Sequence, residues 1–200
     1  MEIPALLNVI QVSYLEESDN LMLTKRFSEE EVRFAIWSCF GDKSLGLDGF
    51  NFRFVKRFWN LLKADVIQVT EQFHSHGKFP KGANASFLAF IPKKEVIGGL
   101  GDYRPISLIG SLYKILSKVL AMRLSKVVGK LVNESQLTFV GGRNVLDSMV
   151  VVNECMHEVK RRKRSTLIFK ENFEKVYDVV RWDFLYHMMR RMEFSERWIG

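Results

Sequence analysis

The chain has 200 residues, of which 47% are apolar and 26% are charged, and it contains four prolines and two cysteines. This composition excludes a disordered tail, a collagen-like rod and a disulfide-stapled miniprotein, and no apolar run approaches the ~20 residues that span a bilayer. The formal net charge is +7, which favours a polyanionic partner. Cys39 and Cys155 are far apart, and the opening MEIPALLNVIQV lacks a basic leader, so we expect an intracellular protein with reduced thiols and no membrane contact.

Residues 1–26 show no clear periodicity and are predicted to be a linker. Ser28 and Glu31 have the spacing of a capping box, and Phe27 with Val32 has the spacing of a hydrophobic staple, so a helix is predicted to begin at Ser28 and to end near Gly41. The glycine-punctuated segment 41–50 is predicted to be a loop.

The next elements follow from apolar spacing and from breaker residues. Residues 54–73 predict one long helix, or two helices with a break near 61–64, ended by Gly77 and Pro80. The remaining elements are, in order, strands over 86–93 and 103–109 that form a β-hairpin, helices over 112–131 and 145–163, a strand over 166–172 and a helix over 183–192. The fold class is therefore a mostly helical α+β architecture.

Short catalytic motifs are mostly absent from the sequence. No P-loop is present, and the histidines and cysteines do not have the spacing of a zinc site. The hairpin carries Lys93, Lys94 and Arg104, which are either solvated turn and ion-pair residues or contacts to a phosphate chain.

Six stretches in collinear order are similar to a known family. They are FSEEEVRFAIWSC, GDKSLGLDGFNFRFVKRFW, ASFLAFIPKK, DYRPISLIGSLYKILSKVLAMRL, ESQLTFVGGRN and FKENFEKVYDVVRWDFL. Together they resemble the reverse transcriptase domain of LINE-type (non-LTR) retrotransposons of the plant type. The resemblance implies a partial right-hand polymerase: residues 27–165 would supply the fingers and early palm, and 166–200 the first palm strand and the following helix.

The resemblance also implies site residues. Lys93 or Lys94, together with Arg104, would hold the triphosphate of an incoming nucleotide, and Tyr177 would be the aromatic gate beneath its sugar. Nucleic-acid contacts are implied for the template-proximal motif and suggested for the basic faces of two helices. The motif contributes Gln136, Gly142 and Arg143, and the helices contribute Lys114, Lys118, Arg123, Lys126, Arg161, Arg162, Lys163 and Arg164. The alternative for the helical residues is a solvated face and a helix end stabilised by cations.

The sequence departs from the family at the palm. The family presents a catalytic aspartate where this chain has Asn172, and a neutral amide neither offsets the charge of Mg²⁺ nor bridges two ions well. Strand alternation would place Glu171 on the opposite face of the predicted strand, so we do not expect it to replace the missing carboxylate. We therefore expect no metal site and no retained Mg²⁺, although intact members of the family use this ion. In the segment 45–49, LGLDG stands where the family tends to have two prolines, and we expect a looser loop.

The leading hypothesis is a truncated, degenerate remnant of an RNA-directed DNA polymerase that is catalytically inactive, because no Asp-Asp motif follows Asn172. In the intact family the partners are an RNA or DNA template-primer and a deoxynucleoside triphosphate, and we expect weak or no binding here. The alternatives are a non-enzymatic basic nucleic-acid-binding module and a translated pseudogene product without a cellular role. The resembled family has a palm hairpin after this point, and without it we expect apolar surface of the palm strand and its helices to be exposed. A nuclear location would follow from the parent element.

Overall fold

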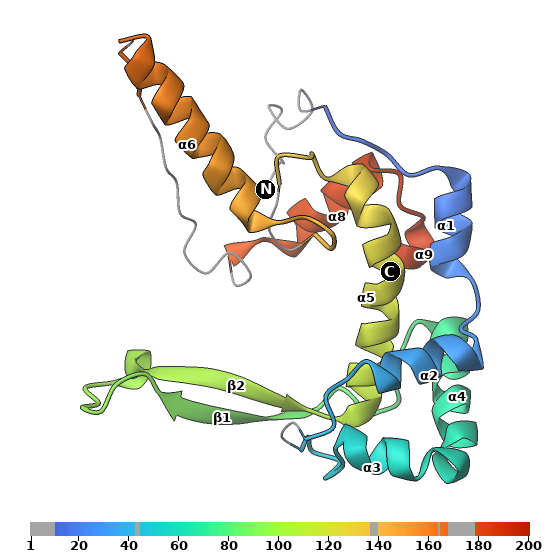
Figure 1. Cartoon of the computed structure of the whole chain (residues 1–200). Coiled ribbons are helices and arrows are strands. Elements are labelled where there is room, and N and C mark those ends of the chain that lie inside the picture. The colour runs from blue at the N-terminus through green and yellow to red at the C-terminus, as the bar shows by residue number, and fades with distance from the viewer. Residues whose placement is uncertain (1–10, 43–44, 137–139, 164, 168–178) are drawn as a thin grey trace. The chain divides into compact units, whose positions relative to one another are not determined.

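The computed structural model describes residues 11–42, 45–136, 140–163, 165–167 and 179–200. The helices and strands in these ranges are α1 (Glu17–Thr24), α2 (Glu29–Trp37), α3 (Phe52–Arg57), α4 (Trp59–His76), β1 (Ser86–Pro92), the 3₁₀ helix η2 (Leu100–Asp102), β2 (Tyr103–Ile109), α5 (Ser111–Leu131), α6 (Val145–Arg161), α8 (Trp182–Arg191) and α9 (Glu196–Ile199) (Figure 1). The chain divides into two compact units, one from Lys25 to Arg123 and one from the described residues on either side of it. The mostly helical α+β class with one hairpin is confirmed. The strand predicted over 166–172 lies almost wholly outside the described residues.

Helix α2 begins where the capping signal predicts. The Ser28 hydroxyl accepts a hydrogen bond from the backbone N–H of Glu31 at 3.2 Å, which satisfies one free donor of the first turn. Phe27 packs against the same apolar cluster as Val32, as a staple requires.

The break between α3 and α4 lies at Phe58 and not at 61–64. Phe58 closes α3 through its N–H to the Phe54 carbonyl, and α4 starts at the next residue. Figure 1 shows the chain changing direction here, and the apolar positions of both short helices then reach one core. Gly77 ends α4 as predicted, with a φ of 65° that favours glycine.

The core of the unit from Lys25 to Arg123 is built by four helices. Its fully or almost fully buried members are Val32, Ala35 and Ile36 from α2, Phe52 and Val55 from α3, Trp59 and Val66 from α4, and Ile115 and Val119 from α5. These are the positions at helical spacing that the sequence marks as apolar.

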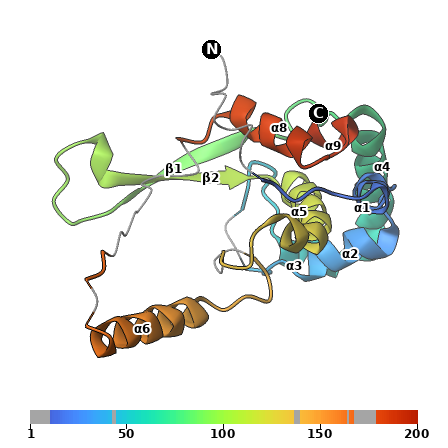
Figure 2. The ribbon, with the colours of Figure 1, turned by 90° about the horizontal axis from the view of Figure 1, so that it is seen from above.

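The hairpin projects from this helical core as a two-stranded arm (Figures 1 and 2). Its strands are antiparallel, and the register pairs Ser86 with Ile109 and Pro92 with Tyr103. Side chains on both faces are largely exposed, including Phe87 at 57% and Leu88 at 60%. Backbone hydrogen bonds between the strands therefore hold the arm together, and side-chain burial contributes little to its stability.

The second unit has its own apolar cluster, formed by Leu15, Leu23, Val127, Leu131 and Phe194. The expected linker over 1–26 contains helix α1 in this unit. Lys130 binds the carboxylate of Asp19 with contacts of 2.7 and 3.0 Å.

Helix α6 belongs to the same unit and lies outside this cluster, with Leu146 and Met149 about 60% exposed. Among the described residues, none of the helices has the length and apolar content that crossing a bilayer requires.

Candidate functional site

The basic residues of the hairpin lie at its tip and have different environments. The register pairs Arg104 with Ile91, and the N–H of Lys93 donates to the Asp102 carbonyl at 2.7 Å as the ladder continues. Because side chains alternate along strands, Lys93 and Arg104 share one face. The Arg104 side chain is exposed and forms no hydrogen bond or ion pair with any described residue.

The contacts of Asp102 distinguish Lys94 from Lys93. Its carboxylate forms an ion pair with Lys94 at 2.8 Å and accepts the N–H groups of Gly98 and Gly99. The Lys94 ammonium, followed by these N–H groups and the charge of Lys93, holds the pKa of Asp102 below its ordinary value. Lys93 instead donates to the neutral carbonyl of Gly101 at 2.9 Å. Asp102 therefore pairs directly with Lys94 and interacts with the charge of Lys93 without direct contact, whereas Arg104 has no ion pair with any described acid.

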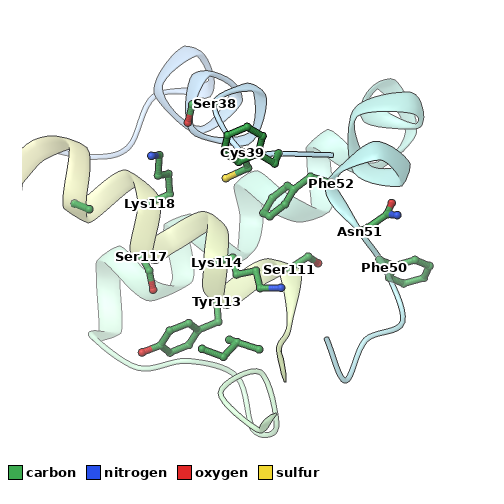
Figure 3. A pocket seen from close by; sticks show the side chains of 13 residues that line it. Ser38, Cys39, Phe50, Asn51, Phe52, Ser111, Tyr113, Lys114, Ser117 and Lys118 are labelled. Atoms are coloured by element: carbon green, nitrogen blue, oxygen red, sulfur yellow. The ribbon is translucent and has the colours of Figure 1, made fainter. Parts of the chain in front are cut away.

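A pocket of about 460 Å³ lies where the segment after α2, the start of α3 and the first turns of α5 meet (Figure 3). Its lining is Ser38, Cys39, Phe40, Phe50, Asn51, Phe52, Ile109, Ser111, Tyr113, Lys114, Ser117, Lys118 and Ala121. The structure thus brings together two predicted nucleic-acid contacts, Lys114 and Lys118, and both are half-buried against apolar walls.

The Cys39 thiol in this pocket donates to the Ala35 carbonyl at 3.3 Å. Burial raises the pKa of Cys39, and the nearby Lys118, Lys56 and Lys114 ammoniums only partly oppose this rise. Cys39 is therefore a neutral thiol at neutral pH.

The loop beside the pocket is anchored to the start of α5. The Asp48 carboxylate accepts both the N–H and the hydroxyl of Ser111, the latter at 2.6 Å. Burial favours the neutral carboxyl, but the Ser111 hydrogen bonds, the Phe50 N–H and the charge of Lys114 together bring the pKa of Asp48 below its ordinary value. A β-carbon on Gly46 would lie 2.2 Å from the Ile109 carbonyl oxygen, so only glycine allows this approach. Asp48 and Gly46 anchor this loop to the start of α5, and the expectation that it is looser than the family's loop stays a prediction.

Arg123 is buried and cannot serve as a phosphate contact. Its side chain is 3% exposed and forms a two-pronged ion pair with Glu31, with both N–O distances 2.7 Å. It also donates to the carbonyls of Lys25 and Arg26 and lies over the Phe27 ring, 4.4 Å from its centroid. Arg123 instead fixes the segment that leads into α2.

Two residues of the template-proximal motif meet at the end of α5. The Arg143 guanidinium donates to backbone carbonyls around this helix end, among them Gln136 at 2.7 Å. Its other acceptors are Gly129, Val132 and Asn133. Gly142 precedes it with a φ of 82°, a region that favours glycine. In this structure Arg143 satisfies carbonyls that the helix leaves free.

The remaining basic candidates divide into paired and solvated residues. Arg161 and Arg162 both bind Glu158, whose pKa they lower. Lys126 and Lys163 are exposed. Arg164 lies outside the described residues.

The catalytic-position residue Asn172 and the gate residue Tyr177 also lie outside the described residues. Within the ranges that are described, no three histidine, cysteine or acidic side chains come close enough together to hold a metal ion.

The chain matches known proteins in sequence. Residues 91–200 match the family model described as "Reverse transcriptase (RNA-dependent DNA polymerase)". The chain is also 28% identical over 159 residues to the "Transposon TX1 uncharacterized 149 kDa protein" of Xenopus laevis, a match that covers 80% of this chain. It spans 12% of the length of that relative.

Proposed function

The chain belongs to the reverse transcriptase family, and we propose that it is a non-LTR retroelement reverse transcriptase domain that has lost nucleotide joining and keeps weak contact with nucleotides and nucleic acid. The observation that carries the proposal is Asn172 in the segment FKENFEKVYD, where the resembled family has its catalytic aspartate.

The donor set at the palm does not fit a pair of magnesium ions. Two-metal catalysis needs carboxylates that neutralise and bridge two cations ~3.5–4 Å apart. Asn172 offers one neutral amide oxygen, which leaves the charge of the ions unmatched. We therefore assign no step of nucleotide joining to this chain.

Residual nucleotide binding would rest on the hairpin. Lys93 and Arg104 share a face, and neither forms a direct ion pair with a described acid. A guanidinium with an ammonium is the pairing that a phosphate chain favours. Lys94 contributes less, because Asp102 already neutralises it.

The first experiment tests the lost chemistry. We expect primer extension on an RNA template with Mg²⁺ to give no more product with the wild-type chain than with Asn172→Ala. Templated DNA synthesis above the level of that control would overturn the proposal. Asn172→Asp shows whether the carboxylate alone restores Mg²⁺-dependent triphosphate binding.

The second experiment tests the hairpin through binding of a fluorescent deoxynucleoside triphosphate. We expect Arg104→Gln and Lys93→Gln each to weaken binding about three- to tenfold, since each removes a charge-assisted hydrogen bond. Lys94→Gln is the matched control and should change affinity less than twofold, as expected for an exposed ion pair. Equal losses from all three variants would mean that the hairpin acts only by net charge.

Binding of nucleic acid without chemistry is the second candidate. It is favoured by the exposed lysines Lys126 and Lys163, which no described acid pairs with. A measurement of RNA affinity across a salt series tests it, because phosphate neutralisation makes log K fall with log salt. An affinity that does not change with salt would exclude this candidate.

A further inference from the structure

Strand β1 of the projecting arm has an outer edge that no other described strand covers (Figures 1 and 2). The N–H of Lys93 donates to the carbonyl of Asp102, the residue opposite it in the register, so this pair is hydrogen-bonded within the hairpin. In an antiparallel ladder such pairs alternate with pairs whose N–H and C=O groups point away from the partner strand. The outward-pointing groups of β1 therefore belong to Ser86, Leu88 and Phe90, and they form no hydrogen bond with any described residue.

The outer edge of β2 differs, because it contains a proline. Pro105 lies opposite Phe90, so its nitrogen also points outward, and it has no N–H to donate. A strand that added to this edge would lose a hydrogen bond within the ladder. The edge of β1, in contrast, has a donor at every outward position from Ser86 to Phe90.

The side chains of β1 are neutral and largely exposed. The strand SFLAFIP has no charged residue, although charges, above all those of lysine, commonly protect an open edge from pairing. Its four large apolar side chains, those of Phe87, Leu88, Phe90 and Ile91, are 49–60% exposed. Such an edge favours a neutral, apolar partner strand, because neither strand then brings a charge that would have to leave water.

A second copy of β1 has these properties and fits the edge. In an antiparallel pair related by a two-fold axis at Leu88, this residue lies opposite its own copy, and Ser86 lies opposite Phe90. That register pairs the outward N–H and C=O groups of all three residues. It also brings apolar side chains together on both faces of the joined sheet.

We propose that the arm is a self-association site, in which the β1 strands of two copies pair about Leu88 to form a four-stranded antiparallel sheet. The association stops at the dimer, because the edges that remain open are those of β2, where Pro105 interrupts the row of donors. The proposal does not depend on the proposed function.

The exposed area of β1 sets the strength of the dimer. With about half of each large side chain exposed, one copy presents roughly 400 Å² of apolar surface and two copies roughly 800 Å². This area is smaller than the ~1,200 Å² at which stable interfaces begin. We therefore expect a weak dimer, with a Kd on the order of 10–100 µM.

Sedimentation equilibrium of the full chain measures the association, with proline variants that act on one edge at a time. Leu88→Pro removes an outward N–H and keeps the hydrogen bonds within the hairpin, so it should weaken the dimer at least about tenfold. Ser107→Pro is the matched control, because Ser107 lies opposite Leu88 and its N–H points out from the edge of β2. The control should change the Kd less than about twofold.

A cysteine at the two-fold axis tests the register. The Cα atoms of a hydrogen-bonded antiparallel pair are ~5.5 Å apart, a distance that a disulfide spans. Cys155 is exposed, so both variants are made with Cys155→Ser. With oxidised glutathione as the oxidant, Leu88→Cys should form a disulfide-linked dimer, and Ser107→Cys should not.

Four results would overturn the proposal. They are a chain that stays monomeric at about 0.5 mM, a concentration about five times the highest expected Kd, equal weakening by the two proline variants, association that continues beyond the dimer, and equal cross-linking of the two cysteine variants. Where the thermal melt shows that a proline variant is misfolded, Leu88→Lys and Ser107→Lys replace the pair, because only the first brings two ammonium groups together at the axis. No nucleotide or template is present in these measurements, so a failure here is distinct from a failure of the proposed function.

Discussion

The pair formed by Arg123 and Glu31 gives the sharpest stability prediction. The Arg123 side chain is 3% exposed and the Glu31 side chain 21%, so removing one partner leaves the other charge largely out of water. Breaking a fully buried pair costs about 3–5 kcal/mol, and the partial access of water to Glu31 reduces this range. We expect Glu31→Gln and Arg123→Met each to lower the free energy of unfolding by about 2–3 kcal/mol.

The two partners should be strongly coupled. Once Arg123 is replaced, Glu31 has no buried charge to neutralise, so the double variant should be little less stable than either single variant. A double-mutant cycle should therefore give a coupling energy of about 2 kcal/mol. Urea unfolding measures this coupling energy, with tryptophan fluorescence as the signal. Trp37 and Trp59 lie in the same unit in edge-to-face contact, with 5.8 Å between their ring centroids.

A second arginine–glutamate pair in the same unit is the control. Arg26 and Glu71 are 3.0 Å apart, but their side chains are 74% and 48% exposed. Their cycle should give at most about 0.5 kcal/mol, as for other solvated pairs. Coupling in the Arg123 cycle no larger than in this control would refute the reasoning that burial makes the pair strong.

Two further predictions concern the loop before α3 and the carboxylates. Gly46→Ala should destabilise its unit by about 1–3 kcal/mol in urea unfolding, because the new β-carbon would overlap the Ile109 carbonyl. Gly99→Ala is the control: its β-carbon would meet open space, so stability should change by less than about 0.5 kcal/mol. Asp48 and Asp19 have pKa values below the ordinary 3.8, so their contribution is present above 3.8 and is lost as the pH falls through the folded-state values. Thermal melts between neutral pH and about pH 2.5 should show this loss, and Asp48→Asn should flatten the acid limb; a limb that Asp48→Asn leaves unchanged would contradict the assignment.

The elements with local signals were predictable from the sequence. The hairpin is marked by two apolar runs that end in Pro92 and Ile109, and the observed strands differ from the expected ranges by one residue at most. Helix α5 follows from apolar spacing, and α2 from the Ser28 cap. In each case the determining residues lie within a few positions of the element they specify.

Elements that depend on distant partners were not predictable. Helix α1 is short, has acids in its first turn, and is held by Lys130, which is 111 residues away. The break at Phe58 has no glycine or proline to mark it, and tertiary packing fixes it by bringing α3 and α4 to one core. The Asp48 anchor on Ser111 spans 63 residues. The spacing of Asp48 between two glycines was visible in the sequence, but its acceptor role was not.

The same limit explains why net charge is a poor guide to where a basic domain binds its partner. A count of lysines and arginines gives each the same weight, yet Arg123 neutralises a buried glutamate, and Arg143 satisfies carbonyls at a helix end. Lys94 forms a direct ion pair with Asp102, and the charge of Lys93 also acts on that carboxylate, whereas Arg104 pairs with no described acid. A cation that is already paired must first lose its partner before it can bind an external anion, and this cost offsets the new interaction. Unpaired cations therefore contribute most to the free energy of anion binding. The residues that can recognise an anion are thus a small subset of the basic residues, and three-dimensional pairing selects them.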